Sequence, residues 1–81
     1  AEEGFIIERE GGGVWAVEGR RVERLVAQTD FENEESAARL QRELAKMGLV
    51  DRLRAAGVEA GDTVRIGETE LEWGAEPGAW V

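Results

Sequence analysis

The sequence predicts an α+β fold, a four-stranded sheet made of two hairpins with helices packed on one face. Two strand-like stretches flank a glycine loop near the start of the chain, and two more flank a short loop near its end. Between them lie three stretches with the periodicity of amphipathic helices. The resulting order is β-β-α-α-α-β-β, and its simplest arrangement is one sheet that buries one face against the helices.

The first two strands are expected at 5–10 (FIIERE) and 14–18 (VWAVE), joined by a loop of three glycines. Both stretches are bounded by glycine and contain apolar residues that alternate with other types. The second stretch places Trp15 and Val17 on one face of its strand. A strand, a short glycine loop and a second strand together indicate a hairpin.

The stretch from Thr29 to Leu49 predicts one capped amphipathic helix. Asn33 is the expected N-cap, because its side chain can accept a hydrogen bond from an unpaired N–H of the first turn. Phe31 precedes the cap and is expected to act as a hydrophobic anchor. Gly48 stands where a helix ends with a residue of positive φ. Four apolar residues recur at helical spacing and are expected on one face: Ala37, Leu40, Leu44 and Met47.

Two shorter helices are expected on either side of this one. The stretch 20–28 (RRVERLVAQ) places three apolar residues at helical spacing: Val22, Leu25 and Val26. The stretch 49–56 (LVDRLRAA) has Val50 and Leu53 as its expected inward residues. Gly57 then ends that helix.

A second hairpin is expected from 63–66 and 69–73. Its two-residue loop, Gly67-Glu68, has glycine first, which suits a type II′ turn. The resulting register pairs three sets of residues: Ile66 with Thr69, Arg65 with Glu70, and Val64 with Leu71. Four apolar side chains then share one face: Val64, Ile66, Leu71 and Trp73. Arg65 and Glu70 oppose each other on the other face.

Composition limits what the chain can do. With 81 residues it forms one domain, and it has neither Cys nor His, so it lacks a thiolate and the commonest general base. A net charge of −8 argues against broad binding to a nucleic-acid backbone, and we expect no direct nucleic-acid binding. No apolar run approaches the ~20 residues of a membrane span. These features fit a reducing compartment without a membrane association, and we expect the protein in the cytoplasm.

The expected organisation is an N-terminal linker at 1–4, one α+β domain at 5–73 and a flexible C-terminal tail at 74–81. The tail is expected because its residues show no periodicity. The N-terminus has neither the basic region nor the apolar region of a signal peptide. It also lacks an initiator methionine, which suggests a piece of a longer protein.

Two patterns resemble ligand sites but have simpler explanations. Four acids could hold a cation: Asp30, Glu32, Glu34 and Glu35. A calcium loop would need glycine where Glu35 stands, so compensation of the helix dipole is favoured. The glycines at 11–13 could cradle a phosphate, but a strand follows them and no lysine is near. A hairpin loop is therefore favoured for this stretch.

Arg20, Arg21 and Arg24 form a basic cluster on a short helix. They could contact a phosphate or an acidic partner, although a solvated helix face is the simpler interpretation. If the domain contacts RNA, these residues and Arg9 are the candidate contacts. The tryptophans on expected strands are assigned to the core rather than to base stacking. Without His no Ser-His-Asp set exists. We predict no catalytic, nucleotide-binding or metal-binding residue in this sequence.

A series of motifs then points to a family. They are VWAVEG, VERLVAQTDFENEESAARLQREL, MG, AG, GDTVRIG and ELEW, in this order between residues 14 and 73. Together with Arg9 on the first strand, they resemble the C-terminal domain of Obg-type GTPases over about residues 5–73. The stretches 29–44 and 61–73 carry the resemblance in combination.

The resemblance implies a parent protein with a glycine-rich N-terminal domain and a central GTPase domain. It implies that the parent binds GTP and GDP with magnesium and is associated with the large ribosomal subunit, ribosome assembly and the stringent response. The family's phosphate-binding and switch motifs have no counterpart in this sequence, so no catalytic position carries over. The expected role is a non-catalytic accessory domain that tunes the GTPase domain of the same chain or docks a partner. The alternative is a stand-alone RNA-binding module that contacts ribosomal RNA.

Overall fold

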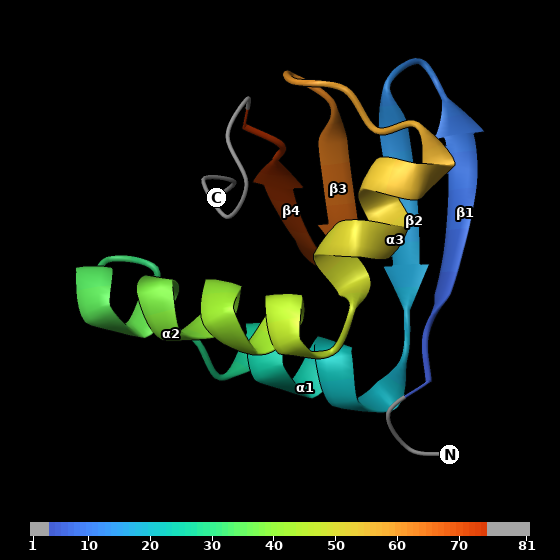
Figure 1. Ribbon diagram of the computed structural model, residues 1–81. Coiled ribbons are helices and arrows are strands. Elements are labelled where there is room, and N and C mark those ends of the chain that lie inside the picture. Colours follow the sequence, from blue (N-terminus) through green and yellow to red (C-terminus); the bar gives the residue numbers. More distant parts are fainter. Residues whose placement is uncertain (1–3, 75–81) are drawn as a thin grey trace.

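The computed structural model describes residues 4–74, and Figure 1 shows how their elements are arranged. The elements are β1 (Ile6–Gly11), β2 (Val14–Glu18), α1 (Arg20–Ala27), α2 (Glu34–Lys46), α3 (Leu49–Ala56), β3 (Thr63–Ile66) and β4 (Thr69–Glu72). One four-stranded sheet with the helices on one face confirms the predicted α+β class and element order. Most of the predicted linker 1–4 and tail 74–81 lies outside the described residues.

The strands form one mixed sheet in the order β1-β2-β3-β4. Both hairpins are antiparallel, as predicted, but the strands that join them, β2 and β3, run parallel. The sequence pattern of neither hairpin predicts this parallel pairing. Because parallel neighbours need a crossover connection, the three helices carry the chain from the end of β2 to the start of β3 at the opposite end of the sheet.

The outer strands differ from their predicted bounds by one residue. β1 begins and ends one residue later than predicted, and its register shifts between Arg9 and Gly11, as in a β-bulge. β4 ends just before Trp73. The Trp73 N–H nevertheless donates to the Asp62 carbonyl at 2.8 Å, and its carbonyl accepts from the Gly61 N–H at 2.9 Å. These two bonds hold the chain in place beyond the end of the strand.

The second hairpin has the predicted register throughout. Gly67 has a φ of +62°, and no non-glycine residue among residues 4–74 has a positive φ. Since a type I′ turn would need a positive φ at Glu68 as well, the turn fits the predicted type II′. Arg65 lies opposite Glu70, as predicted, but its close ion pair is with Glu10, where Nη2 and Oε2 are 2.6 Å apart.

Both ends of α2 follow the prediction. The Asn33 Oδ1 atom accepts hydrogen bonds from the N–H groups of Glu35 at 2.9 Å and Ser36 at 3.1 Å, which confirms the cap. Gly48 separates α2 from α3 with a φ of +86°, a left-handed conformation that favours glycine. Leu49 follows at once and is fully buried. The chain therefore turns from α2 into α3 over two residues, Met47 and Gly48.

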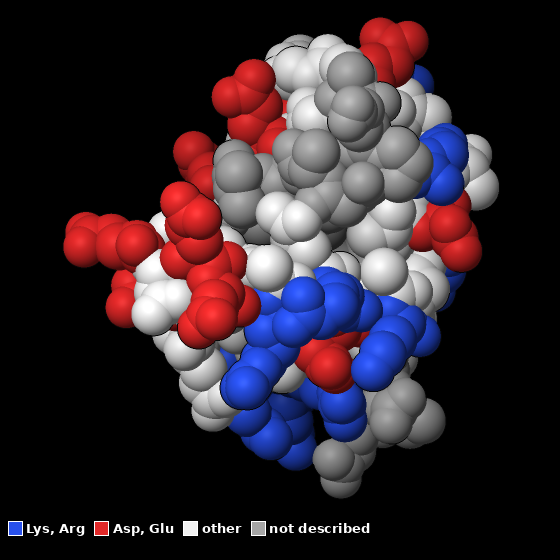
Figure 2. Space-filling view, turned by 60° about the vertical axis from the view of Figure 1, so that its left-hand side comes forward, with Lys and Arg blue, Asp and Glu red and all other residues white. Residues whose placement is uncertain are grey.

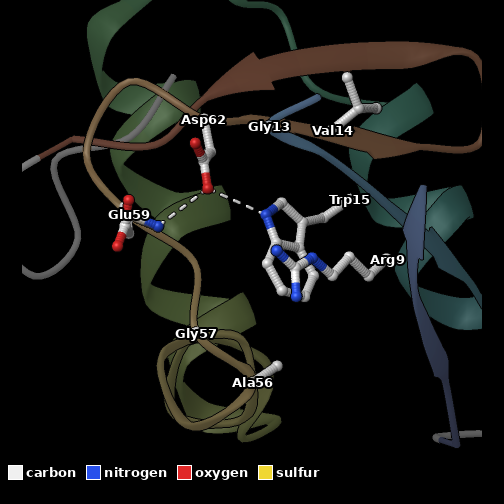
Figure 3. A pocket seen from close by; sticks show the side chains of 8 residues that line it. All are labelled: Arg9, Gly13, Val14, Trp15, Ala56, Gly57, Glu59 and Asp62. Carbon is white, nitrogen blue, oxygen red and sulfur yellow. Dashed lines mark hydrogen bonds between the residues drawn. The ribbon is translucent and has the colours of Figure 1, made fainter. Parts of the chain in front are cut away.

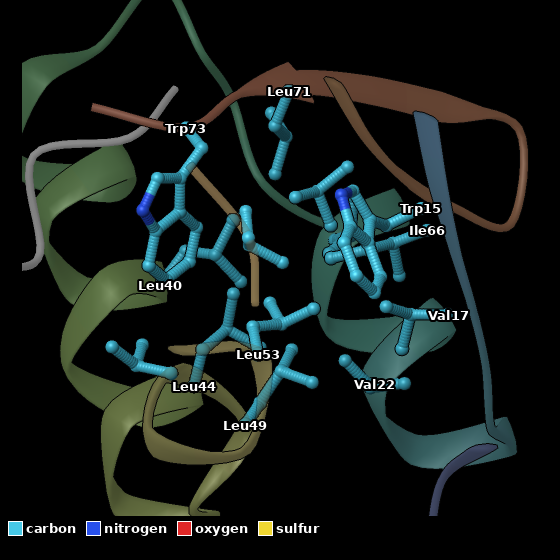
Figure 4. Packing of buried hydrophobic residues seen from close by; sticks show 14 residues of the cluster. Trp15, Val17, Val22, Leu40, Leu44, Leu49, Leu53, Ile66, Leu71 and Trp73 are labelled. Atoms are coloured by element: carbon cyan, nitrogen blue, oxygen red, sulfur yellow. The ribbon is translucent and has the colours of Figure 1, made fainter. Parts of the chain in front are cut away.

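One apolar core lies between the sheet and the helices (Figure 4). Its buried members come from β2, β3, β4, the three helices and the adjoining residues: Trp15, Val17, Val22, Val26, Leu40, Leu44, Leu49, Val50, Leu53, Val58, Val64, Ile66, Leu71 and Trp73. Both described tryptophans belong to this core, which confirms their assignment from the sequence. The apolar face predicted for the second hairpin is confirmed as well.

The apolar face of α2 is confirmed at its centre and is more open at its ends. Leu40 and Leu44 are buried, whereas Ala37 and Met47 are half-buried. Phe31, expected to anchor the start of the helix, is 39% exposed. It lines an open groove with Ala37 rather than entering the core.

Replacing Leu40 or Leu44 with alanine should lower the free energy of unfolding by about 2–5 kcal/mol, because each change leaves a cavity in a packed core. Urea denaturation followed by tryptophan fluorescence measures the loss. Arg39→Ala on the exposed side of the same helix is the control, with an expected change below ~0.5 kcal/mol. Losses as small as the control's in both leucine variants would show that α2 packs through another face.

Asn33→Ala should lower the free energy of unfolding by about 1 kcal/mol, because two N–H groups of the first turn lose their acceptor. Asn33→Asp keeps an acceptor oxygen and should retain most of the stability. Denaturation midpoints of the two variants are compared with that of the unchanged chain. A midpoint unaffected by Asn33→Ala would mean that another residue caps α2.

Candidate functional site

A small polar pocket of about 240 Å³ lies where β1 and β2 meet the connection from α3 to β3 (Figure 3). Trp15 stands at its centre, and its indole Nε1–H donates to Asp62 Oδ2 at 3.0 Å. The same oxygen accepts from the backbone N–H of Glu59 at 3.0 Å. The Arg9 guanidinium lies 5.6 Å from the centroid of the Trp15 ring, within cation–π range. One carboxylate and one ring thus connect three segments of the chain.

These contacts determine the ionisation of Asp62. The hydrogen bond from the Glu59 N–H, the hydrogen bond from the Trp15 indole and the positive charge of Arg9 hold the pKa of the Asp62 carboxyl below its ordinary value. Partial burial acts in the opposite direction and is outweighed. The side chain is therefore a carboxylate at neutral pH and acts as a hydrogen-bond acceptor.

The chemistry of this pocket serves the fold. Trp15 is only 5% exposed, so its ring offers little surface on which a base could stack. Among residues 4–74, no group of three or more His, Cys, Asp or Glu side chains is placed to hold a metal ion. Over the same residues, no helix has the length and apolar character needed to cross a membrane. We assign the pocket a structural role, because its contacts hold the segment between α3 and β3 against the sheet.

The structure places the four predicted contact arginines on two separate surfaces. Arg9 lies over Trp15 near the start of β2. Arg20, Arg21 and Arg24 lie on α1, which follows the other end of that strand, about 17 Å away along the sheet. Arg20 and Arg24 are exposed, and Arg21 is half-buried. Arg9 therefore belongs to the pocket, and the arginines of α1 belong to the helical side of the domain.

A larger basic surface includes residues outside the predicted set. Arg39, Arg42 and Lys46 follow each other on α2 at spacings of three and four, so they share one exposed side of that helix. Arg39 lines the groove between α1 and α2 together with Leu25. This row and the exposed arginines of α1 make up what we call the basic helical face: Arg20, Arg24, Arg39, Arg42 and Lys46. The spacing along α2 was the signal in the sequence that would have found it.

Figure 2 shows how charge is divided over the surface. Lys and Arg side chains gather in the lower part of the view, at the height of α1 and α2 in Figure 1, with a group of acidic side chains to their left. Eight of the ten basic residues lie on the three helices, which carry five of the eighteen acids. On the face of the sheet away from the helices, Glu8 and Glu70 lie in one row with Arg65. Over residues 4–74, the helices thus carry more bases than acids, and the remaining residues carry more acids than bases.

Asp62→Asn should destabilise the domain at pH 7, and its difference from the unchanged chain should shrink as the pH falls. The pKa of Asp62 is lowered in the folded state, so its stabilisation is present above the unfolded pKa of about 3.9 and is lost as the pH falls through the folded value. Urea denaturation of both proteins at neutral and acidic pH measures this difference. Glu59→Gln is the control, since Glu59 contributes its backbone N–H to the Asp62 contact. A difference independent of pH would show that the charge of Asp62 contributes nothing.

Comparison with known proteins identifies the domain. The family described as "Domain of unknown function (DUF1967)" matches residues 5–73. GTPase Obg of Symbiobacterium thermophilum is 51% identical over 76 residues, which are 94% of this chain and 18% of the relative. GTPase Obg of Heliobacterium modesticaldum is 53% identical over 72 residues, with shares of 89% and 16%. GTPase Obg of Rubrobacter xylanophilus is 46% identical over 70 residues, with shares of 86% and 17%.

The chain spans less than a fifth of the length of these curated relatives. The family match extends over all seven elements of the fold, from before β1 to Trp73. It confirms the resemblance found in the sequence motifs. The chain belongs to the DUF1967 family, the C-terminal domain of Obg-type GTPases.

Proposed function

We propose that this domain is a non-catalytic accessory domain of an Obg-like GTP-binding protein. It tunes the GTPase domain of the same parent chain or docks a partner of the parent. One observation carries the proposal. The close polar contacts around Asp62 and Arg65 connect strands and loops of the fold, whereas most other charged side chains are exposed at the surface. Such an arrangement offers surfaces for contact rather than a concave site for a reaction.

The relatives named GTPase Obg are several times longer than this chain, which supports our proposal that the chemistry of the parent belongs to its other domains. We infer that the parent binds GTP and GDP with magnesium there, and we assign no cofactor to this fragment. The proposed docking partner is the large ribosomal subunit. The proposed cellular role of the parent is in large-subunit assembly and the stringent response in the cytoplasm. The unequal charge of the two sides of the domain supports a docking role.

Deleting this 81-residue domain from the parent protein should change its binding to purified large ribosomal subunits or its rate of GTP hydrolysis. Binding is measured by co-sedimentation with GTP and with GDP, and hydrolysis is measured with and without subunits. If the domain docks the parent, binding is lost. If it couples docking to the bound nucleotide, binding persists but no longer differs between GTP and GDP.

The control is the parent with Glu68→Gln, which changes an exposed residue in the turn of the second hairpin and keeps both the core and the basic helical face intact. Binding and hydrolysis that are the same in the deleted and the complete parent would contradict the proposal. A folded GTPase domain in the deleted protein is checked by its affinity for GDP. This check separates loss of a docking domain from general loss of the parent's structure.

A further inference from the structure

The basic helical face concentrates positive charge in a chain whose net charge is −8. Its five cations are exposed and lie on two neighbouring helices. Lys46 lies 4.0 Å from Glu43, a pair of little energetic weight at such exposure. Along α2, the row from Arg39 to Lys46 covers about 10 Å. The face is therefore a compact, two-helix array of cations.

We propose that the basic helical face binds RNA through its phosphate backbone. This inference deepens the proposed function and rests on it, because it gives the chemistry by which the domain would dock on a ribosomal subunit. Four of the five cations are arginines, whose planar guanidinium groups can donate two parallel hydrogen bonds to a phosphate. Direct contact with phosphates requires no base stacking, in agreement with the burial of Trp15 and Trp73.

Among residues 4–74, no aromatic side chain lines the groove between α1 and α2. Beside Arg39 it holds Gln28, Thr29, Ser36 and Glu43, all polar or charged. The leucines that also line it are buried or half-buried and belong to the core or pack against it. Protein interfaces usually have an apolar centre with aromatic anchors, whereas interfaces with nucleic acids are more polar and more positively charged.

Neighbouring acids limit the size of the contact. Glu34 and Glu35 occupy the first turn of α2, and Asp30 and Glu32 precede it. These acids repel a polyanion from that end of the helix, so an RNA strand has to lie across the C-terminal part of α2 and across α1. Five cations contact at most about five phosphates, which for a single strand gives a salt dependence with a slope of at most about −3.5 in log K against log salt.

The experiment measures binding of the 81-residue chain to a fluorescent single-stranded RNA of 20 nucleotides between 50 and 200 mM salt. The test variant is Arg39→Gln with Arg42→Gln, and the matched control is Arg9→Gln with Arg65→Gln. Both remove two arginines and give the same net charge, but the control changes the pocket and the sheet. The test variant should bind about tenfold more weakly, with a salt slope smaller by about 1.4. The control should bind within about twofold of the unchanged chain.

Circular dichroism verifies that both variants fold, and the single changes Arg42→Gln and Arg65→Gln repeat the comparison if the control loses its structure. Three outcomes overturn the proposal. The first is that the chain does not bind RNA at 50 mM salt. The second is that both variants lose RNA affinity equally. The third is that poly-glutamate binds as tightly as RNA, which would identify an acidic protein as the partner. If RNA binding fails while deletion of the domain still alters the parent, the inference falls and the proposed accessory function stands.

Discussion

The parallel pairing of β2 with β3 is the constraint on which the rest of the structure depends. It requires the chain to return to the end of the sheet at which β2 began. There the Thr63 N–H donates to the Gly13 carbonyl at 2.7 Å, and the Asp62 carboxylate accepts from the Trp15 indole beside it. These bonds fix the point at which β3 enters the sheet. The three helices are therefore one long crossover, and the core forms along the path they take.

Among residues 4–74, the helices of the crossover cover one face of the sheet. On the other face, an ion pair joins the two hairpins. Glu10 lies in the bulge of β1 and forms the 2.6 Å ion pair with Arg65 of β3, two strands away. Ala16 of β2 is in register with Arg65 between these strands and is only 4% exposed. The hydrogen bond from Arg65 to Glu10 is also the main cause of the raised pKa of Arg65.

Local patterns in the sequence were sufficient for the features that depend on neighbouring residues. The Asn33 cap, the turn at Gly67 and the register of the second hairpin each follow from a few consecutive positions, and each was predicted. The parallel pairing, the Arg65–Glu10 bridge and the Trp15–Asp62 bond join residues about fifty positions apart, and no periodicity reports such contacts. For the same reason, the sequence predicted only part of the basic helical face. The arginines of α1 were visible as a run, but their place beside the row on α2 depends on how two helices pack.

The charge of this domain illustrates why a net value is a weak guide to contact. The value of −8 describes the field at a distance, and at that range it repels a polyanion. At physiological ionic strength the Debye length is about 8 Å, and exposed charges farther apart than this are largely screened from each other. Charges on the far side of the sheet therefore have little effect at the helices. A strand of RNA at the helices therefore meets the local charge of α1 and α2 rather than the total. The crossover fixes this separation, because it gathers the helices and most of the arginines on one side of the sheet.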